Sequence, residues 1–74
     1  MKTEHGRRFP PPWRVEPHPD DESFIIRDAK GQALAYVYFE DETARQMSLK
    51  RLTRDEARRI AANIAKLPEL LGKG

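Results

Sequence analysis

The chain has 74 residues, no cysteine and a formal net charge of +2. This length allows one small domain, and a folded unit of about 60 residues buries only about 60% of its chain surface, so its stability is marginal. The missing cysteines exclude disulfides and thiolate metal sites. Because the sequence has neither a long apolar run nor a signal peptide, it predicts a soluble, cytoplasmic protein with no membrane contact.

Charge is segregated along the chain. Residues 1–14 carry a net +3, residues 15–43 a net −6 and residues 44–74 a net +5. A general polyanion binder is not expected to place an acidic block in the middle of its chain. The pattern therefore favours acidic and basic parts that face each other, either within one chain or across a dimer.

The first part of the chain predicts an arm followed by a single domain. Residues 1–12 are basic and rich in proline and lack apolar periodicity, which is typical of a disordered segment. We expect one small domain over residues 13–71 and a disordered tail over residues 72–74. Within the domain, residues 13–16 predict a short first strand and residues 17–22 a loop, since two prolines and three acids oppose a β-ladder.

The clearest element is a hairpin over residues 23–40. Two β-favouring runs, at residues 24–26 and 35–39, flank the segment Asp28-Ala29-Lys30-Gly31. Gly31 suits the positive-φ position that closes a three-residue loop with a bulge. If Asp28 pairs with Gln32, one face of the hairpin carries Phe24, Ile26, Leu34, Tyr36 and Tyr38, and the other carries Ile25, Ala35, Val37 and Phe39.

Both predicted faces of this hairpin are apolar. One helix covers one face of an antiparallel sheet, and the other face is usually polar. The second face therefore needs a cover, for which the sequence offers residues 41–50, Trp13 or a second subunit. The candidate self-association face consists of Ile25, Ala35, Val37 and Phe39.

The C-terminal third predicts an amphipathic helix. Thr53 and Glu56 form a capping-box pattern, and apolar residues from Ala57 to Leu67 fall on one arc. Pro68 ends the helix, whereas residues 41–51 suit either a short helix or an extended segment. The expected fold class is α+β: an antiparallel meander of two to three strands packed against one C-terminal helix, with a short preceding helix as an option.

Basic side chains near this helix are candidate nucleic-acid contacts. They are Lys50, Arg51, Arg54, Arg58 and Arg59, with the N-terminal arm as an auxiliary. Clustered cations bind phosphates by releasing counterions. Asp55 stands three and four residues before Arg58 and Arg59, so part of this charge is paired along the helix. An ordinary solvated helix face is the competing interpretation.

Two segments resemble a known family. DAKGQALAYVYFED, at residues 28–41, and LTRDEARRIAANIAKLPELL, at residues 52–71, resemble a family of small uncharacterised alphaproteobacterial proteins. The resemblance covers roughly residues 13–71. It implies no activity, cofactor or catalytic residue.

No enzymatic pattern accompanies these elements. His5 and His18 are the only histidines, no spacing suits a metal site, and no glycine-rich phosphate loop occurs. We expect no catalytic residue, no metal and no cofactor. Two functions remain open: a small protein–protein interaction module whose partner is another protein or a second copy, and a nucleic-acid-binding protein.

Overall fold

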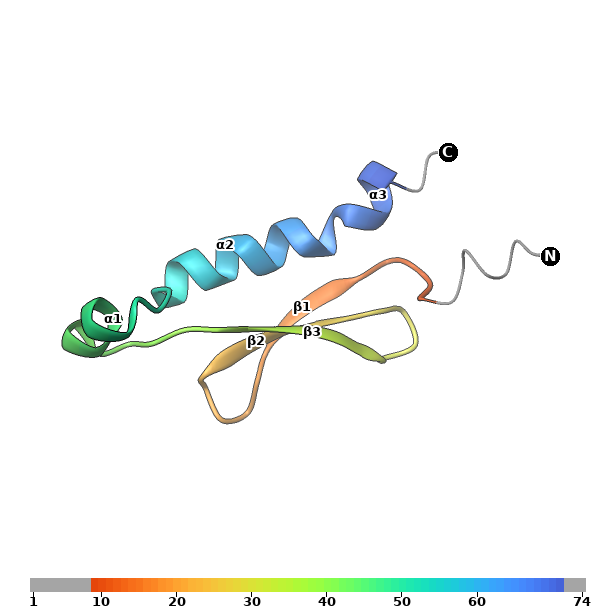
Figure 1. Ribbon diagram of the computed structural model, residues 1–74. Helices are drawn as coiled ribbons and strands as arrows, with labels where there is room; N and C mark the ends of the chain where they lie inside the picture. The colour runs from red at the N-terminus through yellow and green to blue at the C-terminus, as the bar shows by residue number, and fades with distance from the viewer. Residues whose placement is uncertain (1–8, 72–74) are drawn as a thin grey trace.

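In a computed structural model, residues 9–71 are described, and they form a three-stranded sheet with one long helix over one face (Figure 1). The α+β fold class predicted from the sequence is confirmed. The elements in chain order are β1 (Arg14–Pro17), β2 (Ser23–Arg27), β3 (Ala33–Tyr38), α1 (Thr43–Leu49), α2 (Arg54–Ala65) and α3 (Leu67–Leu71). Both pairs of neighbouring strands are antiparallel, and the strand order is β1-β2-β3.

The predicted arm and tail lie mostly outside the described residues. Of the arm, residues 9–12 are described, and two of their carbonyl groups contact the domain. The Phe9 carbonyl accepts a hydrogen bond from Trp13 Nε1 at 3.0 Å, and the Pro10 carbonyl accepts one from the Ala29 N–H at 2.9 Å. Residues 9 and 10 therefore already contact Trp13 and the hairpin turn, before the predicted boundary at residue 13.

The turn of the β2–β3 hairpin forms as predicted. Asp28 Oδ1 accepts hydrogen bonds from the N–H groups of Lys30 and Gln32, both at 2.9 Å. The Asp28 N–H donates to the Gln32 carbonyl at 3.0 Å, which is the predicted pair. Gly31 has a φ of +94°, a conformation in which a side chain is strained.

The predicted hairpin faces were wrong because a bulge follows this turn. Arg27 pairs with Ala33, but Ile26 pairs with Ala35, so Leu34 has no partner in β2. A one-residue shift moves every following side chain to the other face of a strand. Ala35 and Val37 consequently lie on the same face as Ile26, and Tyr36 lies on the opposite face.

The core lies between the sheet and α2. Phe24, Ile26, Val37 and Phe39 form a buried cluster with two alanines of α2, Ala57 and Ala61. Ile26, in the middle strand β2, is 0% exposed. The alanines allow the helix to approach the sheet closely, and the aromatic and branched side chains of the strands fill the space between them.

Helix α2 forms where the sequence pattern predicts it, whereas α3, which contains Pro68, was not predicted. The capping box is present: Thr53 Oγ1 accepts from the Glu56 N–H at 3.1 Å, and Glu56 Oε1 accepts from the Thr53 N–H at 2.8 Å. Between the two options for residues 41–51, the structure has the short helix α1, which carries no buried residue. At the other end, α3 bends away from α2 near Pro68 (Figure 1).

Candidate interaction surface

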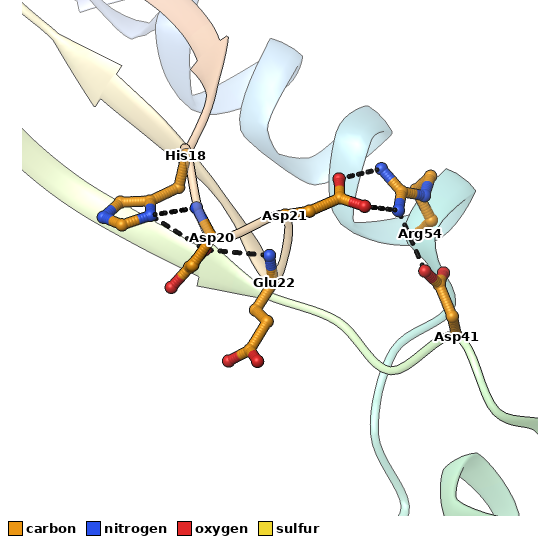
Figure 2. Close-up of polar contacts among 6 residues, drawn as sticks. All are labelled: His18, Asp20, Asp21, Glu22, Asp41 and Arg54. Carbon is orange, nitrogen blue, oxygen red and sulfur yellow. Dashed lines mark hydrogen bonds and ion pairs between the residues drawn. The ribbon is translucent and has the colours of Figure 1, made fainter.

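Arg54, one of the predicted nucleic-acid contacts, is held by the protein's own carboxylates (Figure 2). Its guanidinium donates two hydrogen bonds to Asp21, both at 2.9 Å, and one to Asp41 at 2.8 Å. It also lies over the Phe39 ring, 4.5 Å from the centroid. Arg54 therefore fastens the β1–β2 loop and the segment after β3 to the start of α2.

The hydrogen bonds from Arg54 also change the acidity of their acceptor. They hold the pKa of the Asp21 carboxyl below its ordinary value, although partial desolvation opposes this effect. The same contacts raise the pKa of Arg54. Both side chains are exposed to solvent, so water screens the attraction and the pair contributes little to stability.

The other predicted nucleic-acid contacts are divided between paired and unpaired cations. Asp55 forms ion pairs with Arg58 at 2.6 Å and with Arg59 at 2.9 Å, as predicted. Hydrogen bonding from Arg58 is the main cause that lowers the pKa of Asp55. Lys50 and Arg51 lie between α1 and α2, and within residues 9–71 their side chains have no carboxylate partner.

The predicted self-association face is not one surface. Val37 and Phe39 belong to the core beneath α2, with Ala35 packed against it. Ile25 points the other way, because its neighbours Phe24 and Ile26 both lie in that core. The physical reason is the bulge at Leu34, which moves the side chains of β3 relative to those of β2.

The sheet face away from α2, called the open face below, carries two exposed tyrosines. Tyr36 is 47% exposed and Tyr38 is 55% exposed. Their rings stack with centroids 6.3 Å apart and an interplanar angle of 18°. Both tyrosines come from β3, at positions two residues apart, so the regular alternation of a strand places them side by side.

Polar side chains border this tyrosine pair. The His18 ring lies 6.0 Å from the Tyr36 ring, and His18 Nδ1 accepts a hydrogen bond from the Asp20 N–H at 3.0 Å (Figure 2). In β1 and β2, Glu16 and Arg27 form an ion pair in which the Arg27 hydrogen bond lowers the pKa of Glu16. The open face is therefore aromatic along β3 and charged along β1.

Ile25 is buried although it lies on the open face. It is only 1% exposed. In the sheet it stands between Glu16 of β1 and Tyr36 of β3, and the Arg27 side chain pairs with Glu16 beside it. Long side chains can cover an apolar neighbour with their stems while their polar ends reach water. Side chains of the same chain thus cover Ile25, whereas Tyr36 and Tyr38 stay exposed.

The outer edge of β3, the edge away from β2, is open beside these tyrosines. The Phe39 N–H donates to the Glu22 carbonyl on the β2 side at 3.1 Å, whereas the Glu40 N–H donates to the Leu52 carbonyl at 2.9 Å. Backbone groups alternate in direction along an antiparallel strand. The N–H and C=O groups of Tyr36 and Tyr38 therefore point away from β2, and within residues 9–71 no backbone group bonds to them.

This surface was not predicted from the sequence, because the alternation pattern of the hairpin allows two registers. In the predicted register, Tyr36 and Tyr38 lie on the same face as Phe24 and Ile26. A usable signal was present: Ala33 to Phe39 is an uninterrupted strand sequence without glycine, proline or charge, followed by the acids of residues 40–42. Such a strand at a sheet edge is a known site of pairing with other chains.

The remaining features of residues 9–71 concern metal-binding clusters and surface grooves. No group of three or more acidic or histidine side chains within residues 9–71 is arranged to hold a metal ion. A shallow groove of about 870 Å³ lies between the hairpin turn and the end of α2, with Trp13, Leu34 and Ile64 in its lining. Asp28 and Lys30 also line this groove, and Asp28 Oδ1 accepts hydrogen bonds from the backbone N–H groups of Lys30 and Gln32.

Comparisons with known proteins identify no relative. In a separate respect, none of the helices within residues 9–71 has the length and the apolar character needed to cross a membrane. The resemblance to the alphaproteobacterial family stays a prediction. No family model, no curated protein and no solved structure matches this chain.

Proposed function

We propose that this chain is a small, non-catalytic protein–protein interaction module that associates with a second copy of itself. The observation that carries the proposal is the stacked, exposed pair Tyr36 and Tyr38 on the open face. A large aromatic side chain with a polar end is enriched in protein interfaces, because it buries apolar area and still satisfies its hydroxyl group.

The size of the domain adds support. A unit of about 60 residues has a thin core and low intrinsic stability, and association with a second subunit is one of the common ways to compensate. Here the core consists of one helix against one sheet face, and no other element formed by residues 9–71 covers the other face (Figure 1). A partner that covers Tyr36 and Tyr38 buries apolar area that stays exposed in the single chain.

The first test is sedimentation equilibrium from micromolar to millimolar concentration. We expect the average mass to rise from 8.6 kDa toward twice that value. The double variant Tyr36→Ser, Tyr38→Ser should stay monomeric. The matched control is Leu70→Ser, Leu71→Ser, which removes two exposed apolar side chains of α3 and should associate like the unmodified chain. A monomer at every concentration contradicts the proposal.

Nucleic-acid binding is the alternative, and the ion pairs weaken its support. Arg54, Arg58 and Arg59 already bond to carboxylates of the same chain, so of these five predicted contacts only Lys50 and Arg51 lack a carboxylate partner in the part of the chain that the structure describes. We expect duplex DNA and single-stranded RNA to cause no amide shifts at these residues at low salt. Shifts there that disappear as salt is added indicate binding by counterion release instead.

A further inference from the structure

The outer edge of β3 offers a short and well-defined set of backbone groups. At one end the Leu34 bulge interrupts the ladder. At the other end the Leu52 carbonyl already accepts from the Glu40 N–H. Between these limits, the outward groups with no backbone partner in the described part of the chain are those of Tyr36 and Tyr38. Any strand that pairs with this edge must hydrogen-bond to the N–H and the C=O group of both Tyr36 and Tyr38.

The opposite edge of the sheet is protected in comparison. β1 has only four residues, and the last of them is Pro17, which has no N–H to donate. A short edge strand that ends in proline is one of the ways in which proteins prevent edge-to-edge pairing. β3 has six residues, Ala33–Tyr38, and none of them is proline, glycine or charged. The two edges therefore differ in their capacity to accept another strand.

We propose that β3 of one chain pairs antiparallel with β3 of a second copy, so that the two sheets join into one of six strands. The inference rests on the proposed self-association and specifies its geometry. Val37 lies on the two-fold axis, and Tyr36 stands opposite Tyr38 of the second copy. A two-fold interface uses the same surface on both chains, which a single open edge can supply.

The available backbone groups select this register among the alternatives. Tyr36 opposite Tyr36 places Tyr38 against the bulged Leu34, where the ladder is irregular. Tyr38 opposite Tyr38 places Tyr36 against Glu40, whose N–H already bonds to Leu52. When Tyr36 stands opposite Tyr38, all four outward groups of each chain find a partner.

Side chains and charges agree with the same arrangement. On the open face, each tyrosine of one chain lies beside a tyrosine of the other, and aromatic cross-strand pairs stabilise sheets. Antiparallel pairing also brings the hairpin turn, with the exposed Lys30, toward residues 40–42 of the second copy, which are all acidic. The strand residues that meet carry no like charges.

Amide hydrogen exchange measured by NMR at increasing concentration tests the pairing directly. We expect the amides of Tyr36 and Tyr38 to exchange freely in dilute solution. They should exchange about tenfold more slowly when nine-tenths of the chains are dimeric, because exchange then needs the monomer. The Val37 amide faces β2 and should be protected at every concentration, which makes it the internal control.

A backbone modification separates edge pairing from side-chain stacking. Chemical synthesis of the full chain with an N-methyl group on the Tyr36 nitrogen removes one outward donor and keeps both tyrosine rings. We expect this chain to lose the dimer. The control carries the N-methyl group on Arg54, the first residue of α2, whose N–H has no partner within the helix, and should still dimerise.

The outcomes distinguish the two proposals. Concentration-dependent protection of Tyr36 and Tyr38, together with a monomeric N-methyl-Tyr36 chain, supports pairing through β3. A dimer in which these two amides still exchange freely overturns the β3 pairing and leaves self-association standing. A monomer at every concentration overturns both.

Discussion

The apolar side chains on the two faces of the sheet are shielded from water in different ways. Beneath α2, Phe24, Ile26 and Val37 pack against alanines of the helix, and the cluster is closed to solvent. On the open face, Ile25 is covered by its own neighbours while Tyr36 and Tyr38 stay exposed. The difference shows that the core of this fold is built on one sheet face only, because α2 is the single layer that packs on the sheet within residues 9–71. Tyrosines on the other face are available for a partner.

The largest expected effect comes from the covered face. Ile26→Ala removes a fully buried side chain and should lower the free energy of unfolding by about 2 to 5 kcal/mol, because it leaves a cavity beneath α2. Tyr38→Ser on the open face is the comparison, and it should change the stability of the monomer much less while it weakens association. Urea unfolding at a dilute, monomeric concentration measures both. Equal losses contradict the distinction between the faces.

A smaller effect tests how closely α2 approaches the sheet. Ala61 is buried against the core, so Ala61→Leu should destabilise the domain by about 1 to 3 kcal/mol through overpacking. Ala62, the next residue, is only partly buried, and Ala62→Leu should change stability by less than about 0.5 kcal/mol. Thermal unfolding of the two variants compares them. A tolerated Ala61→Leu indicates that space remains between helix and sheet.

The smallest effect concerns the contact of Arg54 with Asp21 at one end of the covered face. The Asp21 carboxyl has a pKa below its ordinary value of 3.8. Its contribution to stability is therefore present above pH 3.8 and is lost as the pH falls through the lower, folded-state pKa. A carbon-detected NMR titration of the Asp21 carboxyl measures that value.

Variants of two arginines sharpen this titration. Arg54→Gln removes the hydrogen bonds to Asp21 and should return its pKa toward the ordinary value. Arg59→Gln alters an ion pair with Asp55 instead and should leave Asp21 unchanged. Tyr36 and Tyr38 should stay stacked in both variants, and the NMR chemical shifts of their ring protons should therefore be the same. An unchanged Asp21 pKa in Arg54→Gln shows that the contact is not formed in solution.

Local patterns were sufficient to predict most elements. The capping box at Thr53 and Glu56, the turn at Asp28 and Gly31, and the pairing of Asp55 with two arginines all depend on residues within a few positions of one another. Short-range hydrogen bonds and ion pairs of this kind follow from the spacing in the sequence. The contact of Arg54 with Asp21 spans 33 positions, and no local pattern reveals it.

The sequence by itself determined that the chain forms a hairpin and a capped amphipathic helix, because those elements arise from local backbone and side-chain preferences. Only the tertiary structure decided which face of β3 packs beneath α2. With apolar residues at almost every position from Leu34 to Phe39, either register buries apolar area, so alternation alone cannot choose. The bulge at Leu34 places Val37 in the core, and the tyrosines consequently remain at the surface and beside the open edge.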